Sequence, residues 1–178
     1  MSDKMNTYSG KQFYPMEMEE KDICIEDIAH ALSLLCRGGG HIKYFYSVGQ
    51  HSINCAKEAL ARKWSGKVIL GCLLHDASEA YISDIIRPVK KHLTNYMEIE
   101  EMIMNVIFRK FGLSDLTASE KVQIRQIDDE MLDGEMHALL NGELIPTHML
   151  ISEPNFQLES TENIEREFLD LFLQLMIK

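Results

Sequence analysis

Apolar residues recur at helical spacing along most of the chain. From residue 25 they fall at three- and four-residue steps, which is the period of a helix with one buried face. The first such set is Ile25, Ile28, Ala29, Leu32 and Leu35. The same period predicts further helices over residues 47–64, 67–79, 92–111, 117–140 and 160–178. Strand-like alternation is confined to residues 11–14 and 22–25. The pattern therefore predicts an all-α protein of about six helices.

Glycine, proline and capping residues mark where these helices begin and end. The glycines at 38–40 stop the first helix, and their backbone can approach a ligand closely. Pro88 makes residues 80–91 a loop with at most a short helical turn. Thr117 and Glu120 have the spacing of a capping box at the start of the helix that follows.

The length of 178 residues predicts one domain over residues 1–178. Residues 1–21 lack clear periodicity and are expected to form an extended arm laid over the domain. Residues 22–140 form the motif-bearing core, and 160–178 a closing helix. No apolar run approaches the roughly 20 residues of a membrane span, and the N-terminus has no apolar stretch typical of a secretory signal. The absence of C-x-x-C pairs indicates reduced thiols and a cytoplasmic protein. The four cysteines are Cys24, Cys36, Cys55 and Cys72.

A net charge of −10 argues against nucleic acid as a partner, because binding the phosphate backbone needs many lysines and arginines. The charge leaves room for a small anionic substrate, and nothing in the sequence decides between a monomer and a homodimer. One basic group follows the third predicted helix, and it fits a solvated helix start as well as a phosphate-facing role. Its members are Arg87, Lys90, Lys91 and His92.

Four polar residues stand where helix packing alone would not place them. They are His51, His75, Asp76 and Asp128. Each alone fits an ordinary core or surface residue, but buried imidazoles and carboxylates need partners or a metal ion. Two imidazoles and two carboxylates suit a borderline-to-hard divalent cation. Glu79 follows His75 by one helical turn, so its carboxylate is placed to take a proton from a metal-bound water.

The order His51, His75-Asp76, Asp128 resembles the H…HD…D signature of the HD superfamily of metal-dependent phosphohydrolases. The stretch HDASEAYISDIIRPVK, residues 75–90, is similar to the corresponding stretch of bacterial 5'-deoxynucleotidases in that superfamily. Upstream, IEDIAHALSLLCRGGGHIKYFYSVGQHS resembles a phage and bacterial branch of small HD hydrolases. The resemblance covers roughly residues 22–140.

The resemblance implies a single HD-domain helical bundle in which His51, His75, Asp76 and Asp128 bind one divalent ion. Mn, Co, Mg, Fe and Zn are not distinguished. It further implies that Glu79 handles the nucleophilic water and that the substrate is a small phosphorylated nucleotide. In the same way, Asp84 corresponds to a residue that contacts the sugar hydroxyl or positions water, and Arg37 to one that meets the phosphate. Lys90 is a second candidate for the phosphate.

Two details of the resemblance concern single positions. The order Ile127-Asp128, Met131-Leu132 and Glu135 matches the pattern A-D-x-x-L-L-x-x-E, which favours Asp128 over Asp129 as the ligand. Family members usually carry an aromatic residue directly after the arginine, where this chain has Gly38. We therefore expect loose discrimination between ribose and deoxyribose.

The leading hypothesis is a phosphomonoesterase acting on nucleoside 5'-monophosphates. The alternatives are an HD phosphohydrolase of a pyrophosphate-bearing or cyclic nucleotide, and a binding module that keeps the metal without catalysis. A di-iron oxygenase would need further ligands, for which His41 and His92 are the candidates. A structural zinc site is the least favoured alternative, because no cysteine is expected near the cluster.

Overall fold

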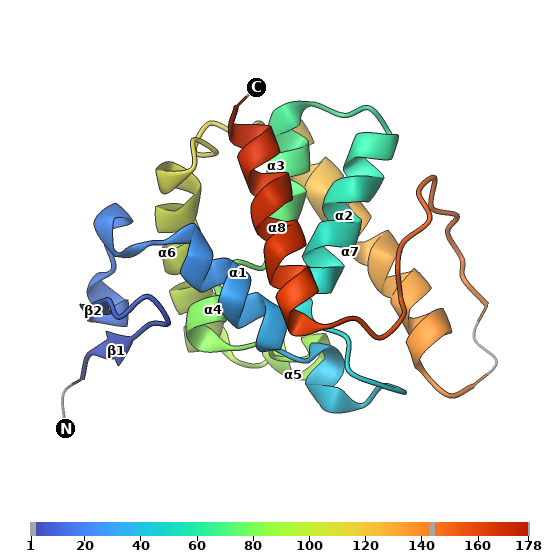
Figure 1. Ribbon diagram of the computed structural model, residues 1–178, viewed down its shortest axis with the longest axis horizontal. Coiled ribbons are helices and arrows are strands. Elements are labelled where there is room, and N and C mark those ends of the chain that lie inside the picture. The colour runs from blue at the N-terminus through green and yellow to red at the C-terminus, as the bar shows by residue number, and fades with distance from the viewer. Residues whose placement is uncertain (1–2, 143–144, 178) are drawn as a thin grey trace.

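The centre of the molecule is a helix buried along nearly all of its length. In the computed structural model, which describes residues 3–142 and 145–177, helix α3 runs over Gly66–Leu74 and residues 68–74 are all buried. A helix that is apolar on every side needs cover on every side. Its cover comes from α2 (Val48–Ala61), α7 (Ala118–Leu139) and α8 (Thr161–Met176) (Figure 1).

The remaining helices complete the bundle around α3. Helix α1 (Ile25–Leu34) packs against α8 and α2, and Figure 1 shows α8 lying between them. Helix α6 (Thr94–Lys110) lies at the side of the bundle next to the N-terminal arm. Two short helices, α4 (Glu79–Ile82) and α5 (Arg87–Lys90), connect α3 to α6. One hydrophobic core joins residues from Phe13 in the arm to Phe172 in α8.

The all-α prediction is confirmed, with α1, α2, α3, α6, α7 and α8 as the longer helices of the described chain. Ser47 caps α2 by accepting a hydrogen bond from the backbone N–H of Gln50. Thr117 and Glu120 form the predicted capping box of α7. Among the described residues, no helix has both the length and the apolar character that crossing a membrane requires.

The prediction of one helix over residues 67–79 is wrong, because α3 ends at Leu74 and α4 begins only at Glu79. The imidazole of His75 explains the break. Its Nδ1 lies 2.8 Å from the carbonyl oxygen of Cys72 and occupies an acceptor that the helix would otherwise use. The chain then continues in turns, in which the backbone N–H of Ala77 donates a hydrogen bond to the carbonyl oxygen of Leu74.

The arm contains a small sheet that the alternation only partly predicted. Strand β2 (Gln12–Phe13) pairs with β1 (Met5–Asn6) in antiparallel register. Residues 22–25 form no strand, because a 3₁₀ helix at Glu20–Asp22 leads almost directly into α1. Two further 3₁₀ helices lie at Pro15–Glu17 and Arg37–Gly40.

The arm is fastened to the bundle, as expected for a segment laid over the domain. Phe13 and Met18 are buried in the core. The carboxylate of Asp27 in α1 accepts hydrogen bonds from the backbone N–H and the hydroxyl of Ser9, at 2.6 and 2.8 Å. Residues 1–2 of the predicted arm and residue 178 of the predicted closing helix lie outside the described residues.

Helices α1, α2 and α8 meet at Gly49, which lies two residues before His51. A Cβ atom at this position would lie 3.1 Å from Cγ2 of Ile164 and 3.2 Å from the backbone carbonyl of Leu32. We expect Gly49→Ala to lower the free energy of unfolding by about 1–3 kcal/mol, because the backbone of α1 cannot yield locally. Urea denaturation measures this change.

Gly66 supplies the matched control, since it is also a helical glycine but nothing lies within 4 Å of its Cβ position. Gly66→Ala should leave stability unchanged or raise it by less than about 1 kcal/mol. Equal effects of the two substitutions would contradict the close packing assigned to Gly49.

Candidate metal centre

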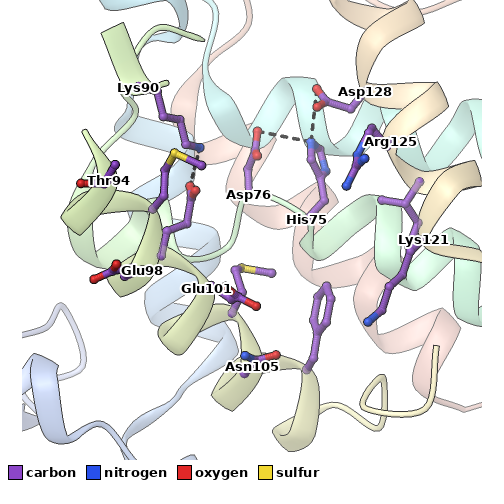
Figure 2. A pocket seen from close by; sticks show the side chains of 15 residues that line it. His75, Asp76, Lys90, Thr94, Glu98, Glu101, Asn105, Lys121, Arg125 and Asp128 are labelled. Carbon is purple, nitrogen blue, oxygen red and sulfur yellow. Dashed lines mark hydrogen bonds and ion pairs between the residues drawn. The ribbon is translucent and has the colours of Figure 1, made fainter. Parts of the chain in front are cut away.

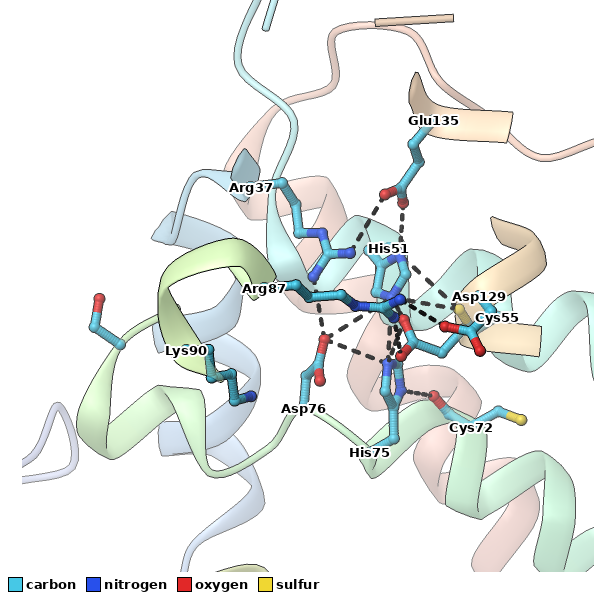
Figure 3. A network of polar contacts seen from close by, with 12 residues as sticks. Arg37, His51, Cys55, Cys72, His75, Asp76, Arg87, Lys90, Asp129 and Glu135 are labelled. Carbon is cyan, nitrogen blue, oxygen red and sulfur yellow. Dashed lines mark hydrogen bonds and ion pairs between the residues drawn. The ribbon is translucent and has the colours of Figure 1, made fainter. Parts of the chain in front are cut away.

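Four side chains predicted as metal ligands meet at the end of α3. His51 lies in the first turn of α2, His75 directly follows the last residue of α3, Asp76 comes next, and Asp128 lies midway along α7. Figure 3 shows the side chains of His51, His75 and Asp76 pointing toward one another. The burial of α3 fixes this point in space, because α2 and α7 both pack directly on it.

The donor atoms of the four residues lie at distances that suit one shared ion. Nε2 of His51 is 3.2 Å from Nε2 of His75 and 3.3 Å from Oδ1 of Asp128. Nε2 of His75 is 3.3 Å from Oδ2 of Asp76 and 3.6 Å from Oδ1 of Asp128. The fifth distance, from Nε2 of His51 to Oδ2 of Asp76, is 3.8 Å. Bonds of 2.0–2.2 Å to a tetrahedral ion place donor atoms roughly 3.3–3.6 Å apart, so the set fits a metal.

The other ring nitrogen of each histidine is already engaged. Nδ1 of His51 lies 2.5 Å from Oε1 of Glu135, and Nδ1 of His75 lies 2.8 Å from the carbonyl oxygen of Cys72. An Nδ1–H donated to an oxygen leaves the Nε2 lone pair for a metal. Both imidazoles are therefore held in the orientation that ligation needs.

The cluster also includes a cysteine, although none was expected near it. Sγ of Cys55 lies 3.6 Å from Nε2 of His51, and His51, Cys55 and His75 form a group that could hold a metal ion. Cys55 follows His51 by four residues in α2, so helical periodicity was the signal that could have found it. Burial raises the pKa of the Cys55 thiol well above its ordinary value, and the charge of Asp128 raises it further. The thiol is therefore a weaker anionic donor than the carboxylates.

Arg37 and Glu135 form a layer behind the ligands. Nη1 of Arg37 donates to Oδ2 of Asp76 at 3.2 Å, and Nη2 donates to Oε2 of Glu135 at 3.4 Å. Burial acts to lower the pKa of Arg37, but the charges of Glu135 and Asp76 hold it above its ordinary value. Glu135 was recognised only as part of a sequence pattern. Its place two turns after Asp128 on the same face of α7 was the signal that it reaches the same site.

Glu79 is buried beside this cluster with one carboxyl oxygen unused. Its side chain is 3% exposed, and Oε2 has no hydrogen-bond partner among the described residues. Burial raises the pKa of Glu79 to about 9, and the charges of Asp76 and Asp84 add to the effect. An unpartnered buried carboxyl group is costly and indicates a role other than packing.

Asp84 and Lys90 lie further out, in the segment between α4 and α6. Burial raises the pKa of Asp84, while the charge of Arg37 opposes that rise. Nζ of Lys90 donates to Oε1 of Glu100 in α6 at 2.5 Å. Lys90 is thus paired with a carboxylate of the protein, and its predicted contact with a phosphate would require exchange of that partner.

Arg87 reaches the cluster from α5, although the sequence predicts no more than its membership of a basic group. Nη2 donates to Oδ2 of Asp128 at 2.6 Å, and Nη1 donates to Oδ1 of Asp129 at 2.5 Å. Asp128 therefore faces the imidazoles with one oxygen and Arg87 with the other. Asp129 is the more exposed of the two aspartates.

A cavity of about 750 Å³ opens onto the ligand cluster between α6 and α7 (Figure 2). His75, Asp76 and Asp128 line the end at the cluster. Met104, Phe108 and Ile124 give it an apolar portion. The charged residues along its sides are Lys90, Glu98, Glu100, Glu101, Lys121 and Arg125.

Comparison with known proteins gives partial matches. The chain is 42% identical over 109 residues to the uncharacterized protein YfdR of Escherichia coli K12, a match that covers 61% of this chain and 58% of YfdR. It is 36% identical over 111 residues to the uncharacterized protein RCAP_rcc00048 of Rhodobacter capsulatus, covering 59% and 56% of the two chains. The chain thus spans a little over half the length of these relatives. No protein-family model matches it.

The buried Glu79 makes the stability of the metal-free protein depend on pH. Because its pKa is about 9 in the folded chain and ordinarily 4.5, the folded state keeps a proton that the unfolded state loses between these values. Stability therefore falls as pH rises from about 4.5 to about 9. Glu79→Gln removes this dependence. The free energy of unfolding of the Glu79→Gln variant, relative to that of the unsubstituted protein, should therefore rise by about 1–3 kcal/mol between pH 5 and pH 8.

Urea denaturation at several pH values in the presence of a chelator measures this difference. Glu153→Gln, at an exposed position, controls for the loss of one carboxylate. A constant difference between Glu79→Gln and the unsubstituted protein across the pH range would show that Glu79 is not held protonated.

Proposed function

We propose that the protein is a metal-dependent phosphohydrolase that releases phosphate from nucleoside 5'-monophosphates. The observation that carries the proposal is the convergence of two imidazole Nε2 atoms and two carboxylates within 3.2–3.8 Å of one another in the five distances given above. The sequence resemblance of residues 22–140 to HD phosphohydrolases supports the same assignment. Nε2 atoms with fixed Nδ1 partners are prepared for ligation rather than for packing.

In this proposal His51, His75, Asp76 and Asp128 hold one divalent ion. Imidazole and carboxylate donors suit Mn, Co, Fe, Zn or Mg, with harder ions favoured by the carboxylates. A divalent ion held there would lower the pKa of a bound water and offset charge on the phosphoryl group. The raised pKa values of His51 and His75 support the assignment, because despite burial the surrounding carboxylates favour positive charge at this point.

Glu79 is the proposed proton acceptor. Its unpartnered Oε2 is available for a hydrogen bond that the described protein residues do not supply. In the metal-free protein its carboxyl group is protonated near neutral pH. A nearby cation stabilises the charged form of a carboxyl group, so ion binding would lower the pKa of Glu79 toward the range of a general base.

The buried Arg37 is hydrogen-bonded to Asp76 and Glu135, and its direct contact with the phosphate stays a prediction. Asp84 is proposed to meet the sugar, and Lys90 to add positive charge beyond the ligands. With two anionic ligands the site keeps little net positive charge, which favours a monophosphate over a triphosphate in a chain of net charge −10.

A second candidate is hydrolysis of a pyrophosphate-bearing nucleotide. Arg125 and Lys121 line the cavity one and two turns before Asp128 in α7, and neither has an ion-pair partner among the described residues. Such cations could receive additional phosphates. A screen of phosphate release from nucleoside mono-, di- and triphosphates and cyclic nucleotides, with each of the five metals, separates the candidates. Cleavage of triphosphates or cyclic nucleotides with inert monophosphates would overturn the leading proposal.

The two overlapping donor sets predict different metal contents for single variants. We expect Asp128→Ala to lose the ion and Cys55→Ala to retain it, because the carboxylate is the better donor. Elemental analysis after dialysis against a limiting metal concentration measures occupancy, which should be about one ion per chain before substitution. Loss of the ion from Cys55→Ala with retention in Asp128→Ala would favour the histidine-cysteine group instead.

Substitution of Glu79 separates proton transfer from ligation. Glu79→Ala should keep the metal and lose about 10²–10⁴ in the rate of phosphate release, the usual contribution of a positioned acid or base. Steady-state kinetics together with elemental analysis test this. Parallel loss of metal and activity would make Glu79 a ligand.

A further inference from the structure

We propose that Arg87 is the side chain that grips the phosphoryl group of the substrate, an inference that rests on the proposed function. Arg87 lies in α5, in the segment that links the ligand-bearing end of α3 to the cavity wall formed by α6. Figure 3 shows its guanidinium group reaching into the ligand cluster from α5. The proposal gives Arg87 the role that sequence resemblance had assigned to Arg37.

The position of Arg87 is set by Asp128. Its Nη2 is 2.6 Å from Oδ2 of Asp128, while Oδ1 of that carboxylate is 3.3 Å from Nε2 of His51. The carboxylate of Asp128 therefore lies between the guanidinium group and Nε2 of His51. A phosphoryl group bound at those atoms would lie within reach of an arginine held there.

The exposure of the two arginines separates their roles. The side chain of Arg37 is 13% exposed and bonded to two carboxylates that are themselves 15% and 5% exposed. The side chain of Arg87 is 48% exposed, and its second partner, Asp129, is 56% exposed. A substrate arriving from solvent can meet Arg87 by displacing its pair with the exposed Asp129, whereas its other partner, Asp128, is 20% exposed. Arg37 is committed to the protein, where it holds Asp76 and Glu135.

The partners of Arg87 are also the ones most easily exchanged. The exposed pair with Asp129 contributes little, because water screens it. A cation held by Asp128 would share the charge of that carboxylate and weaken its attraction for Arg87. A phosphate dianion offers the guanidinium group two oxygens in a fork geometry, which is the arrangement that arginine binds most strongly.

The other nearby cations fit this role less well. Lys90 is bonded to Glu100 and offers a single ammonium group. Arg125 lines the cavity, but no hydrogen bond or ion pair joins it to a ligand side chain among the described residues. Within the described part of the chain, only Arg87 combines direct contact with a predicted ligand and a half-exposed guanidinium group.

The test is the binding of inorganic phosphate to the Co²⁺-loaded protein, measured by isothermal titration calorimetry. The affinity for Co²⁺ is measured separately. Arg87→Ala should weaken phosphate binding about 10- to 100-fold, as expected for a lost charge-assisted hydrogen bond, and change the Kd for Co²⁺ by less than about threefold. Arg87→Lys should recover part of the affinity. Arg109→Ala removes the same charge from an exposed position on α6 next to Glu20, and it should bind phosphate as the unsubstituted protein does.

Three results would overturn the inference. Unchanged phosphate binding by Arg87→Ala would show that another group grips the phosphate. Equal losses of phosphate and Co²⁺ affinity would make Arg87 a positioning residue for Asp128 only. A loss of the same size in Arg109→Ala would reduce the effect to net charge. If the unsubstituted Co²⁺-loaded protein bound no phosphate, the proposed function itself would fail, which distinguishes that failure from an error about Arg87.

Discussion

Burial of α3 on every side is the constraint from which the candidate site follows. A helix whose residues 68–74 are all buried cannot accept polar side chains along its length. The polar residues that follow it must therefore satisfy one another at its end. His75 begins this by bonding to the carbonyl oxygen of Cys72, which ends the helix and turns its ring toward α2 and α7. The same bond thus shapes the backbone and orients a predicted ligand.

Charge balance determines how the rest of the cluster is built. Asp76, Asp128 and Glu135 place three carboxylates around two imidazoles at the edge of the hydrophobic core. Arg37 compensates Asp76 and Glu135 from the inside, and Arg87 compensates Asp128 from the solvent side. Buried carboxylates with such partners are tolerable only when the geometry is held. A divalent ion between the four predicted ligands would offset the negative charge of the carboxylates that the two arginines leave uncompensated.

The sequence predicts the fold well because its signals are local. Helical period and capping residues such as Thr117 depend on neighbours within a few positions. The break after Leu74 was missed because it depends on a side-chain bond from His75 that periodicity does not show. Residues 22–25 alternate like a strand, but no neighbouring strand is available to pair with them in the described chain.

The site is predictable only where residues stand out by type. Histidine-aspartate pairs in an apolar setting are conspicuous, so the four predicted ligands could be named. Cys55, Glu135 and Arg87 each look ordinary in the sequence. Cys55 lies four residues from its partner His51 on one helix. Packing between elements brings Glu135 to His51 across 84 residues, and Arg87 to Asp128 across 41. Sequence spacing offers a hint for the first two through helical periodicity on α2 and α7, but none for Arg87.

Gly38, which stands where family members usually carry an aromatic residue, belongs to a loop whose backbone conformation favours glycine. Gly38 and Gly39 both have φ of +61°, and Gly40 has φ of +80°, a region that other residues rarely adopt. An aromatic residue at position 38 would strain this loop, so its absence is not a simple exchange of side chains. The backbone of Gly38 instead acts to lower the pKa of the Asp84 carboxyl group, against the rise that burial causes. In the proposed function this loop lies beside the residue that would meet the sugar, so selectivity at that point would depend on the Asp84 carboxylate and not on a stacking ring.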